Sequence, residues 1–157
     1  GKSKKSRAAL HRRVGGDELD DARLLERAFD LVAQLVLLVA RELHDDHALR
    51  ERTNIELNVK VGAAYHRMGR PEDADRHFDR ALKSFEARVS RGADDPATRY
   101  YIATAYALRG DASEALDSLA RVARRQPALT RARAACDPDL ESLRGDPAFD
   151  ALLAADV

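Results

Sequence analysis

The chain is poor in the residues that hold many small proteins together. Its 157 residues include one cysteine, one methionine and no tryptophan, and aromatic residues make up only 5% of the total. A single thiol, at Cys136, cannot form an internal disulfide, so we expect the reducing environment of the cytoplasm. Because alanine and leucine are abundant in place of aromatic residues, the composition favours helices over strands.

Net charge and long apolar runs are also missing. The formal net charge is zero, which gives no overall attraction to nucleic acid or to a membrane surface. The longest apolar stretch, residues 31–40, contains Gln34 and is too short to cross a bilayer of ~30 Å, so we expect no membrane insertion. Arginine greatly outnumbers lysine, a composition that suggests a GC-rich bacterial genome.

The first residues are the one strongly charged segment. Residues 1–13 carry six basic side chains and no acidic one. We interpret residues 1–16 as a flexible basic tail or linker, with a tether to an anionic surface as the alternative. The basic residues are Lys2, Lys4, Lys5, Arg7, Arg12 and Arg13.

Prolines and glycines divide the remaining chain into helices. Prolines stand where first turns should begin, and an aspartate precedes several of them as a capping residue. We expect Asp95, Asp137 and Asp146 to cap helices, and Asp111 to form a capping box with Glu114. Gly69, Gly92, Gly110 and Gly145 are expected at helix ends. The predicted helices cover residues 17–44, 46–68, 71–91, 96–109, 111–125, 128–135, 138–144 and 147–154.

Two stretches of the chain carry the same residue pattern. Asn58-x-x-Val61-Gly62-x-x-Tyr65 is followed by Ala74-x-x-x-Phe78-x-x-Ala81, and Arg99-x-x-Ile102-Ala103-x-x-Tyr106 is followed by Ala115-x-x-x-Leu119-x-x-Val122. The gaps within each copy are identical, which indicates a stacked helical repeat. Equivalent positions lie 41 residues apart, from Gly62 to Ala103. The surplus over a 34-residue repeat is about two helical turns, which we place in the helix over residues 71–91.

This pattern resembles the tetratricopeptide repeat. The resemblance implies an all-α solenoid of helical hairpins, a right-handed superhelix with a long N-terminal helix and a C-terminal helical cap. Residues 17–157 would form one such domain, with repeat cores at 55–88 and 96–127. Asn58 and Arg99 stand where the family has a tryptophan-type residue, so we expect those positions to be less buried. The positions expected to pack the repeat are Gly62, Tyr65, Ala74, Phe78, Ala81, Ala103, Tyr106, Ala115 and Leu119.

The last segment resembles the closing segment of many bacterial tetratricopeptide arrays. Such arrays often form the C-terminal part of kinases, cyclases or transcriptional regulators, so the resemblance implies a regulatory piece of a larger signalling protein. A last repeat needs a cover for its apolar face. We assign that role to residues 128–157, and in particular to Leu140, Leu143, Phe149, Leu152 and Leu153.

The resemblance also implies a function without catalysis or cofactor. In this family a protein or peptide partner binds the concave surface formed by the first helix of each pair. The lysine and asparagine set that grips C-terminal carboxylates in chaperone-binding relatives is missing here, so capture of a chaperone tail is not expected. Candidate partner-binding residues are Glu56, Val59, Ala63, His66, Arg67, Ala97, Tyr100, Thr104 and Leu108.

Three alternative functions stay open. His44 and His47, with carboxylates between them, could bind a metal or a small molecule, although aspartates are also expected there as helix caps. His66 and His77 are expected to be solvated.

Two apolar stripes on the helix over residues 17–44 favour a homodimer or a helix buried within its own fold. An arginine-rich stretch could bind an acidic partner, but not nucleic acid, which would need a larger basic face with aromatic residues. It comprises Arg121, Arg124, Arg125, Arg131 and Arg133.

Overall fold

The computed structural model describes residues 22–40, 42 and 46–154, and these are helical apart from short connections. The chain divides into two compact units, Gly1–Val39 and Ala40–Val157. The described helix over residues 22–40 lies in the first unit except for its last residue, Ala40. Within the described residues, no helix combines the length and the apolar character needed to cross a membrane.

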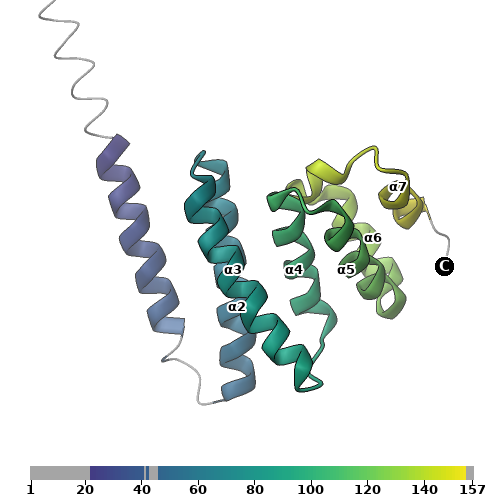
Figure 1. Cartoon of the computed structure of the whole chain (residues 1–157), viewed down its shortest axis with the longest axis horizontal. Coiled ribbons are helices and arrows are strands. Elements are labelled where there is room, and N and C mark those ends of the chain that lie inside the picture. The colour runs from purple at the N-terminus through teal and green to yellow at the C-terminus, as the bar shows by residue number, and fades with distance from the viewer. Residues whose placement is uncertain (1–21, 41, 43–45, 155–157) are drawn as a thin grey trace, which may run out of the picture. The chain divides into compact units, whose positions relative to one another are not determined.

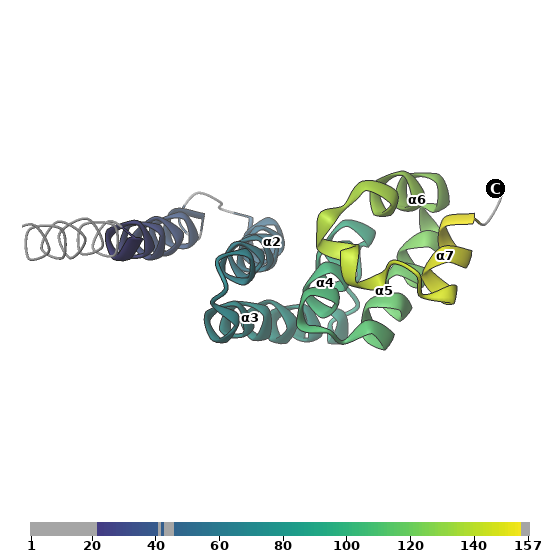
Figure 2. The same cartoon turned by 90° about the horizontal axis from the view of Figure 1, so that it is seen from above.

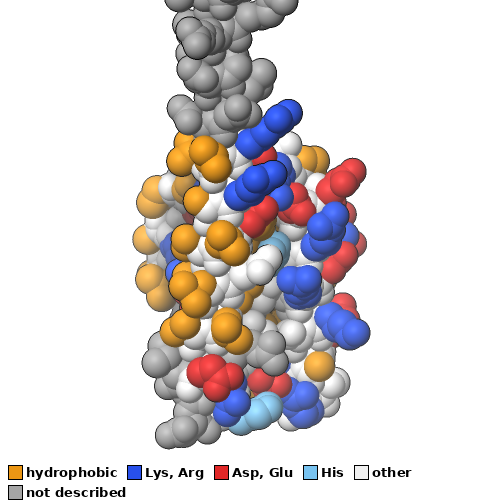
Figure 3. All heavy atoms as spheres, turned by 90° about the vertical axis from the view of Figure 1, so that its left-hand side faces the viewer, with side chains coloured by type: hydrophobic (Ala, Val, Ile, Leu, Met, Phe, Trp, Pro, Cys, Tyr) orange, Lys and Arg blue, Asp and Glu red, His pale blue; other side chains and the backbone are white. Residues whose placement is uncertain are grey.

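The N-terminal helix (residues 22–40) carries many hydrophobic side chains that remain exposed. Figure 3 shows hydrophobic side chains gathered in a band along this helix. Leu31 is 68% exposed and Leu25 is 71% exposed. Both predicted apolar stripes are therefore present on the helix surface. The exposed large hydrophobic residues of this helix are Leu24, Leu25, Leu31, Val32, Leu35, Val36, Leu38 and Val39.

The second unit consists of antiparallel helix pairs followed by a shorter closing segment (Figure 1). Its described elements are α2 (His47–Arg67), α3 (Pro71–Ser90), α4 (Pro96–Arg109), α5 (Ala112–Arg125), α6 (Pro127–Cys136), the 3₁₀ helix η1 (Pro138–Leu143) and α7 (Pro147–Ala154). The predicted helix ends agree with these bounds to within one or two residues. The segment predicted as a helix at residues 138–144 is a 3₁₀ helix, the tighter form often found in short connecting pieces.

Capping explains most of these boundaries. Asp95 accepts a hydrogen bond from the backbone N–H of Thr98, and Asp137 and Asp146 make equivalent bonds two residues ahead. The four predicted glycines all adopt positive φ, from 71° to 87°. The predicted capping box at Asp111 is wrong. The Asp111 carboxylate makes no cap bond and instead pairs with Arg109 at 3.3 Å, because that cation ends the preceding helix.

Within the second unit, α2 packs on α3, α4 packs on α5, and α2 also packs against α4. Figure 2 shows α3 and α6 at opposite edges of this stack. The α2–α3 crossing is very tight at Gly62, where an added Cβ would lie 2.5 Å from a ring carbon of Phe78. Phe78 is fully buried, and three of its ring carbons would lie within 3.1 Å of the added Cβ. The small residue at position 62 is therefore a packing requirement.

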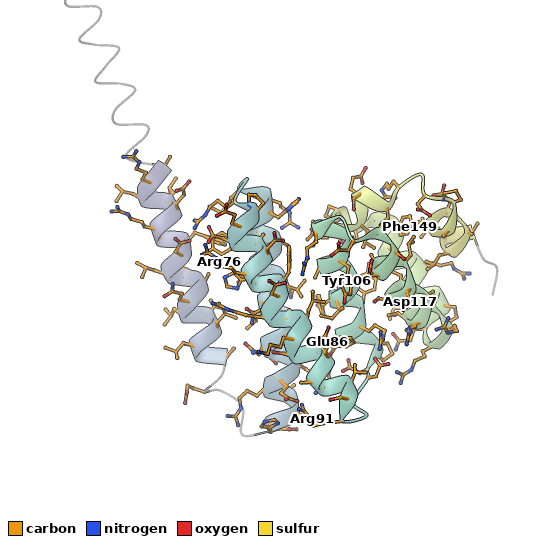
Figure 4. The ribbon with its side chains drawn as sticks, viewed as in Figure 1. Arg76, Glu86, Arg91, Tyr106, Asp117 and Phe149 are labelled. Carbon is orange, nitrogen blue, oxygen red and sulfur yellow. The ribbon has the colours of Figure 1, made fainter. Side chains whose placement is uncertain are left out.

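The second pair and the closing segment share one hydrophobic core. Leu140, Leu143 and Phe149 are buried against Ala103 and Leu119, and Leu152 and Leu153 pack at the edge of the same cluster. Figure 4 shows Phe149 where the closing segment meets this pair. Burial of these apolar side chains contributes roughly 1.5–3 kcal/mol each to the stability of this end of the stack.

The helix α3 is longer than α5, as the 41-residue spacing predicts. With the two copies aligned, Arg125 at the end of α5 corresponds to Ser84, so residues 85–91 have no counterpart in the second copy. We call residues 85–91 the α3 extension. Its Arg88 is buried, and the guanidinium nitrogens of Arg88 lie 3.2 Å from the Asp95 carboxylate and 3.7 Å from the Glu51 carboxylate. These contacts fix the extension to the beginnings of α2 and α4.

Two predicted exposures are wrong. Asn58 is 4% exposed and Arg99 is 8% exposed, although polar residues were expected to leave these positions open. Asn58 is buried because its amide donates to the Asn54 carbonyl oxygen and lies 3.0 Å from His77. Arg99 is buried because its guanidinium makes two 2.8 Å bonds to the Asp94 carboxylate. Each buried polar group thus has partners that offset its loss of water.

Candidate functional site

Side chains from the first helices of the two pairs, α2 and α4, and from α6 meet on one surface of the second unit. Lys60 of α2 lies 5.4 Å from the centre of the Tyr101 ring of α4, and Arg133 of α6 lies 4.9 Å from the same centre. Glu56, one turn before Lys60, pairs with it at 2.6 Å. We call the surface around Glu56, Lys60, Tyr101 and Arg133 the first-helix face. It presents an aromatic ring that two cations contact, and each of these cation–π contacts is favourable.

The charges on the first-helix face hold Glu56 in its ionised form. Burial alone would raise the pKa of Glu56, but hydrogen bonds from Lys60 and Tyr101 and the charges of Lys60 and Arg133 outweigh it. The pKa of Glu56 therefore lies below its ordinary value. The hydrogen bond to Glu56 likewise raises the pKa of Lys60, against the opposing effect of burial. Arg133 makes no ion pair with any residue that the structure describes, so one cation of this face is not balanced by a carboxylate.

Two contacts join the closing segment to this face. The Tyr100 hydroxyl donates to the Asp137 carboxylate at 3.0 Å, and Arg133 stacks over the Tyr100 ring at 3.8 Å. Burial, followed by the negative charge of Asp137, raises the pKa of Tyr100 well above its ordinary value. Arg67 of α2 forms an ion pair with Asp139 of η1. This pair links the end of α2 to the closing segment across the first-helix face.

The structure separates the nine predicted partner-binding residues into two groups. Val59, Ala63, Tyr100 and Thr104 are buried, so in this fold they offer no surface to a partner. Neighbouring helices cover them, since α2 packs against α4 and α6 lies over Tyr100. The remaining five are exposed or half-buried: Glu56, His66, Arg67, Ala97 and Leu108.

At two of the buried positions the prediction is displaced by one residue along the helix. Lys60, not Val59, and Tyr101, not Tyr100, lie on the first-helix face. One residue turns a helix by about 100°, which exchanges a surface position for a buried one. The charge of Lys60 beside the apolar Val59 is the signal that could have set the rotation correctly. Sequence reasoning also missed the role of Tyr101, because two adjacent tyrosines give no such signal.

The five arginines of the basic stretch do not form one surface. Arg121 pairs with Asp117 at 2.9 Å, and Arg125 donates to the Asp94 carbonyl oxygen at 2.6 Å. Arg133 belongs to the first-helix face, as described above. The other two, Arg124 and Arg131, line a mainly apolar depression between α5, α6 and α7.

The histidines give no support to a metal centre in the described part of the chain. His44 lies outside the described residues, and His47 is exposed and 4.0 Å from Glu51. Among the residues that the structure describes, no group of three or more histidine, cysteine, aspartate or glutamate side chains could hold an ion. His77 is not solvated as expected, because its ring stacks on Tyr65 with 5.4 Å between centres and lies beside Asn58.

A stack of helix pairs with side chains of successive first helices on one surface defines the class of helical-repeat interaction modules. Residues 52–128 match the family model described as Tetratricopeptide repeat. The match supports a tetratricopeptide repeat domain in this part of the chain, and with it a protein–protein interaction or scaffold role. Repeats of this family are typically non-catalytic and bind protein partners. No curated protein and no solved structure matches the chain.

Proposed function

We propose that this chain is a non-catalytic scaffold domain whose first-helix face binds a peptide segment with an acidic side chain. The observation that carries the proposal is Arg133, a cation held over two tyrosine rings without a carboxylate partner in the described residues. Tyr101 beside it adds an aromatic surface, and Lys60, which is paired with Glu56, contacts the same ring. A carboxylate that approaches Arg133 would gain a charge-assisted hydrogen bond.

The wider setting follows from the closing segment. Leu140, Leu143 and Phe149 cover the second pair, as expected for the end of an array. The cover supports an end of the array at this segment, and from the resemblance of the segment to those of bacterial arrays we propose a place at the C-terminal, regulatory end of a larger bacterial signalling protein in the cytoplasm. Residues 128–157 would then be the cap of the array, and the partner a protein of the same signalling assembly.

The proposal is tested with peptides selected from a random library displayed on phage and then labelled with fluorescein. We expect selected peptides to share an acidic residue and to bind the Lys60→Glu/Arg133→Glu variant roughly tenfold or more weakly. The matched control is Arg80→Glu/Lys83→Glu, which removes the same charge from exposed side chains without ion pairs in the described part. Equal weakening by both variants, or selection of basic peptides, would contradict the proposal.

A homodimer through the N-terminal helix is a second candidate function. Its carrying observation is the exposure of two apolar stripes, with Val36 and Val39 both more than two-fifths exposed. A two-fold contact between copies would cover one stripe and close on itself. We expect light scattering to show a dimer that dissociates when both valines are changed to serine. A monomer whose mass is independent of concentration would rule out this candidate.

A further inference from the structure

A groove of about 510 Å³ lies between α3 and α5 over α4. It lies apart from the first-helix face, whose residues Glu56, Lys60, Tyr101 and Arg133 do not line it. Figure 4 shows Glu86, Tyr106 and Asp117, which come from these three helices and line the groove together. We call it the extension groove, for the reason given next.

The extension groove exists because the first repeat is longer than usual. The residues that α3 contributes are Phe85, Glu86, Val89 and Ser90, and all four belong to the α3 extension, residues 85–91. The second copy has no equivalent of these residues, and a repeat of the usual ~34 residues has no room for them. The groove is therefore a property of this chain and not of the repeat in general.

The wall formed by the α3 extension is firmly held. Buried Arg88 bonds to Asp95 at 3.2 Å and to the Ala48 carbonyl oxygen at 3.3 Å, while Arg91 pairs with Glu51 at 2.5 Å. The Arg99 guanidinium stacks on Phe85 at 5.0 Å from the ring centre. A preformed wall of this kind lowers the entropy that binding would otherwise cost.

The lining combines an apolar floor with a negative rim. Phe85 and Ile102 are buried beneath the groove and Val89 is half-buried at its side. Glu86 and Glu114 are exposed at the rim, and neither makes an ion pair with another described residue.

The two cations that line the groove do not balance these acids. Arg99 is bound to Asp94 and Arg121 is bound to Asp117, so each is already neutralised. Burial and then the charges of Glu86 and Glu114 raise the pKa of Tyr106, which shows that both carboxylates act on the same part of the groove. The unbalanced charge at the rim is therefore negative.

From this complementarity we infer that the extension groove binds a basic amphipathic segment of a partner protein. An apolar side chain of that segment would rest on Phe85 and Ile102. Its lysine or arginine side chains would pair with Glu86 and Glu114, where no competing cation is free. The first-helix face and the extension groove would then bind segments of opposite charge, and a scaffold could hold two partners at once.

The test uses the whole chain and two short fluorescein-labelled peptides with leucines at helical spacing, one with lysines and one with glutamates at the other positions. We expect saturable binding of the lysine peptide, measured by fluorescence anisotropy, and at least roughly tenfold weaker binding of the glutamate peptide. Amide chemical shifts of the labelled protein should change most at residues 85–90 and 113–118. Absence of saturable binding, or shift changes confined to the first-helix face, would overturn the inference.

Two variants locate the interaction. Glu86→Lys/Glu114→Lys should weaken binding of the lysine peptide roughly tenfold or more, while the control Asp75→Lys/Asp150→Lys should change it less than about twofold. Both pairs are exposed and without ion pairs in the described part, and both change net charge equally. If the first pair alters the circular dichroism spectrum, Glu86→Gln/Glu114→Gln replaces it. Equal effects of the groove and control pairs would show a purely non-specific attraction and overturn the inference.

Discussion

The two helix pairs meet the same packing requirement with different side chains. In the first pair, Gly62 allows the large ring of Phe78 to lie against the α2 backbone. In the second pair the equivalent residues are Ala103 and Leu119, both fully buried. A smaller residue faces a larger one in the first pair, and intermediate sizes occur in the second. What the repeat preserves is the combined volume at the crossing, because protein interiors are close-packed.

The two pairs also differ in their buried polar groups. In the first pair, the Asn58 side-chain oxygen lies 3.0 Å from Nδ1 of His77. The equivalents in the second pair are Arg99 and Ser118, and Arg99 turns instead to Asp94 in the preceding connection. The first pair thus satisfies its polar residue internally, whereas the second satisfies it with the chain that leads into it. A shared backbone arrangement does not require shared polar contacts.

The largest loss of stability should come from removing the closing segment, which covers the apolar face of the second pair and not that of the first. A chain that ends at Pro127 loses Leu140, Leu143 and Phe149, each worth roughly 1.5–3 kcal/mol of burial. We expect a loss of roughly 5 kcal/mol, a much lower melting temperature and association of the exposed core. As a finer test, Phe149→Ala should cost about 3–5 kcal/mol and the exposed Leu129→Ala less than about 0.5 kcal/mol. A soluble and equally stable truncated chain would contradict this dependence.

The second prediction gives the α2–α3 crossing the residues of the α4–α5 crossing, alanine in place of Gly62 and leucine in place of Phe78. Gly62→Ala should destabilise the protein by about 1–2 kcal/mol in urea unfolding, because the clash with Phe78 exceeds the gain of up to about 1 kcal/mol in helix propensity. In the Phe78→Leu background the same alanine should stabilise, since it fills the space that the ring leaves. The double-mutant cycle measures this coupling directly. Additive effects of the two substitutions would show that combined volume is not what the crossing preserves.

A third prediction concerns the α3 extension, which the second pair lacks. Arg88→Ala should cost about 1–3 kcal/mol, because it leaves Asp95 and Glu51 with fewer partners and opens space in the packing. Arg88→Met should recover part of this loss by restoring the apolar contacts. Urea unfolding of both variants, with exposed Arg80→Ala as the control, provides the comparison. An Arg88→Ala variant as stable as the control would show that the extension is not held by this side chain.

The smallest effect is a pH dependence at the start of the second pair. Burial would raise the pKa of Asp95, but hydrogen bonds from Thr98 and the charges of Arg52 and Arg88 outweigh it and lower the pKa. A lowered pKa in the folded state stabilises the protein above the unfolded pKa of ~3.9, and this contribution is lost as the pH falls through the folded value. Asp95→Asn should therefore reduce the melting temperature at pH 7, and its difference from the parent should begin to shrink below about pH 4 and vanish only below the lowered folded pKa. A difference between them that did not change with pH would contradict this account.

The sequence allowed the backbone of the second unit to be predicted closely. Helix starts at prolines and ends at glycines depend on local backbone chemistry, which a few neighbouring residues determine. The repeat spacing also located the extra turns in α3 correctly. The exception, Asp111, shows where local reasoning fails, since Arg109 competes with the helix amides for the same carboxylate.

The candidate surfaces were harder to predict, because they depend on contacts between distant segments. Tyr100 could be recognised as buried only once α6 was known to place Arg133 over its ring. The extension groove depends on which side chains of three helices face one another, and the extra length of α3 alone does not predict that. Whether Glu86 remains without a cation is likewise decided by residues far along the chain.

Arg133 lies in the closing segment yet belongs to the first-helix face, and Asp139 of the same segment pairs with Arg67 of α2. Binding there and the docking of α6 and η1 are therefore linked equilibria. A peptide bound at Arg133 would slow hydrogen exchange of the amides in α6 and η1. By the same reciprocity, local unfolding of α6 and η1 would lower the affinity of the first-helix face for the peptide. A protease that cuts between α5 and η1 would thus release the partner without touching the helix that carries Lys60. The closing segment would thus control whether the first-helix face can keep a partner bound.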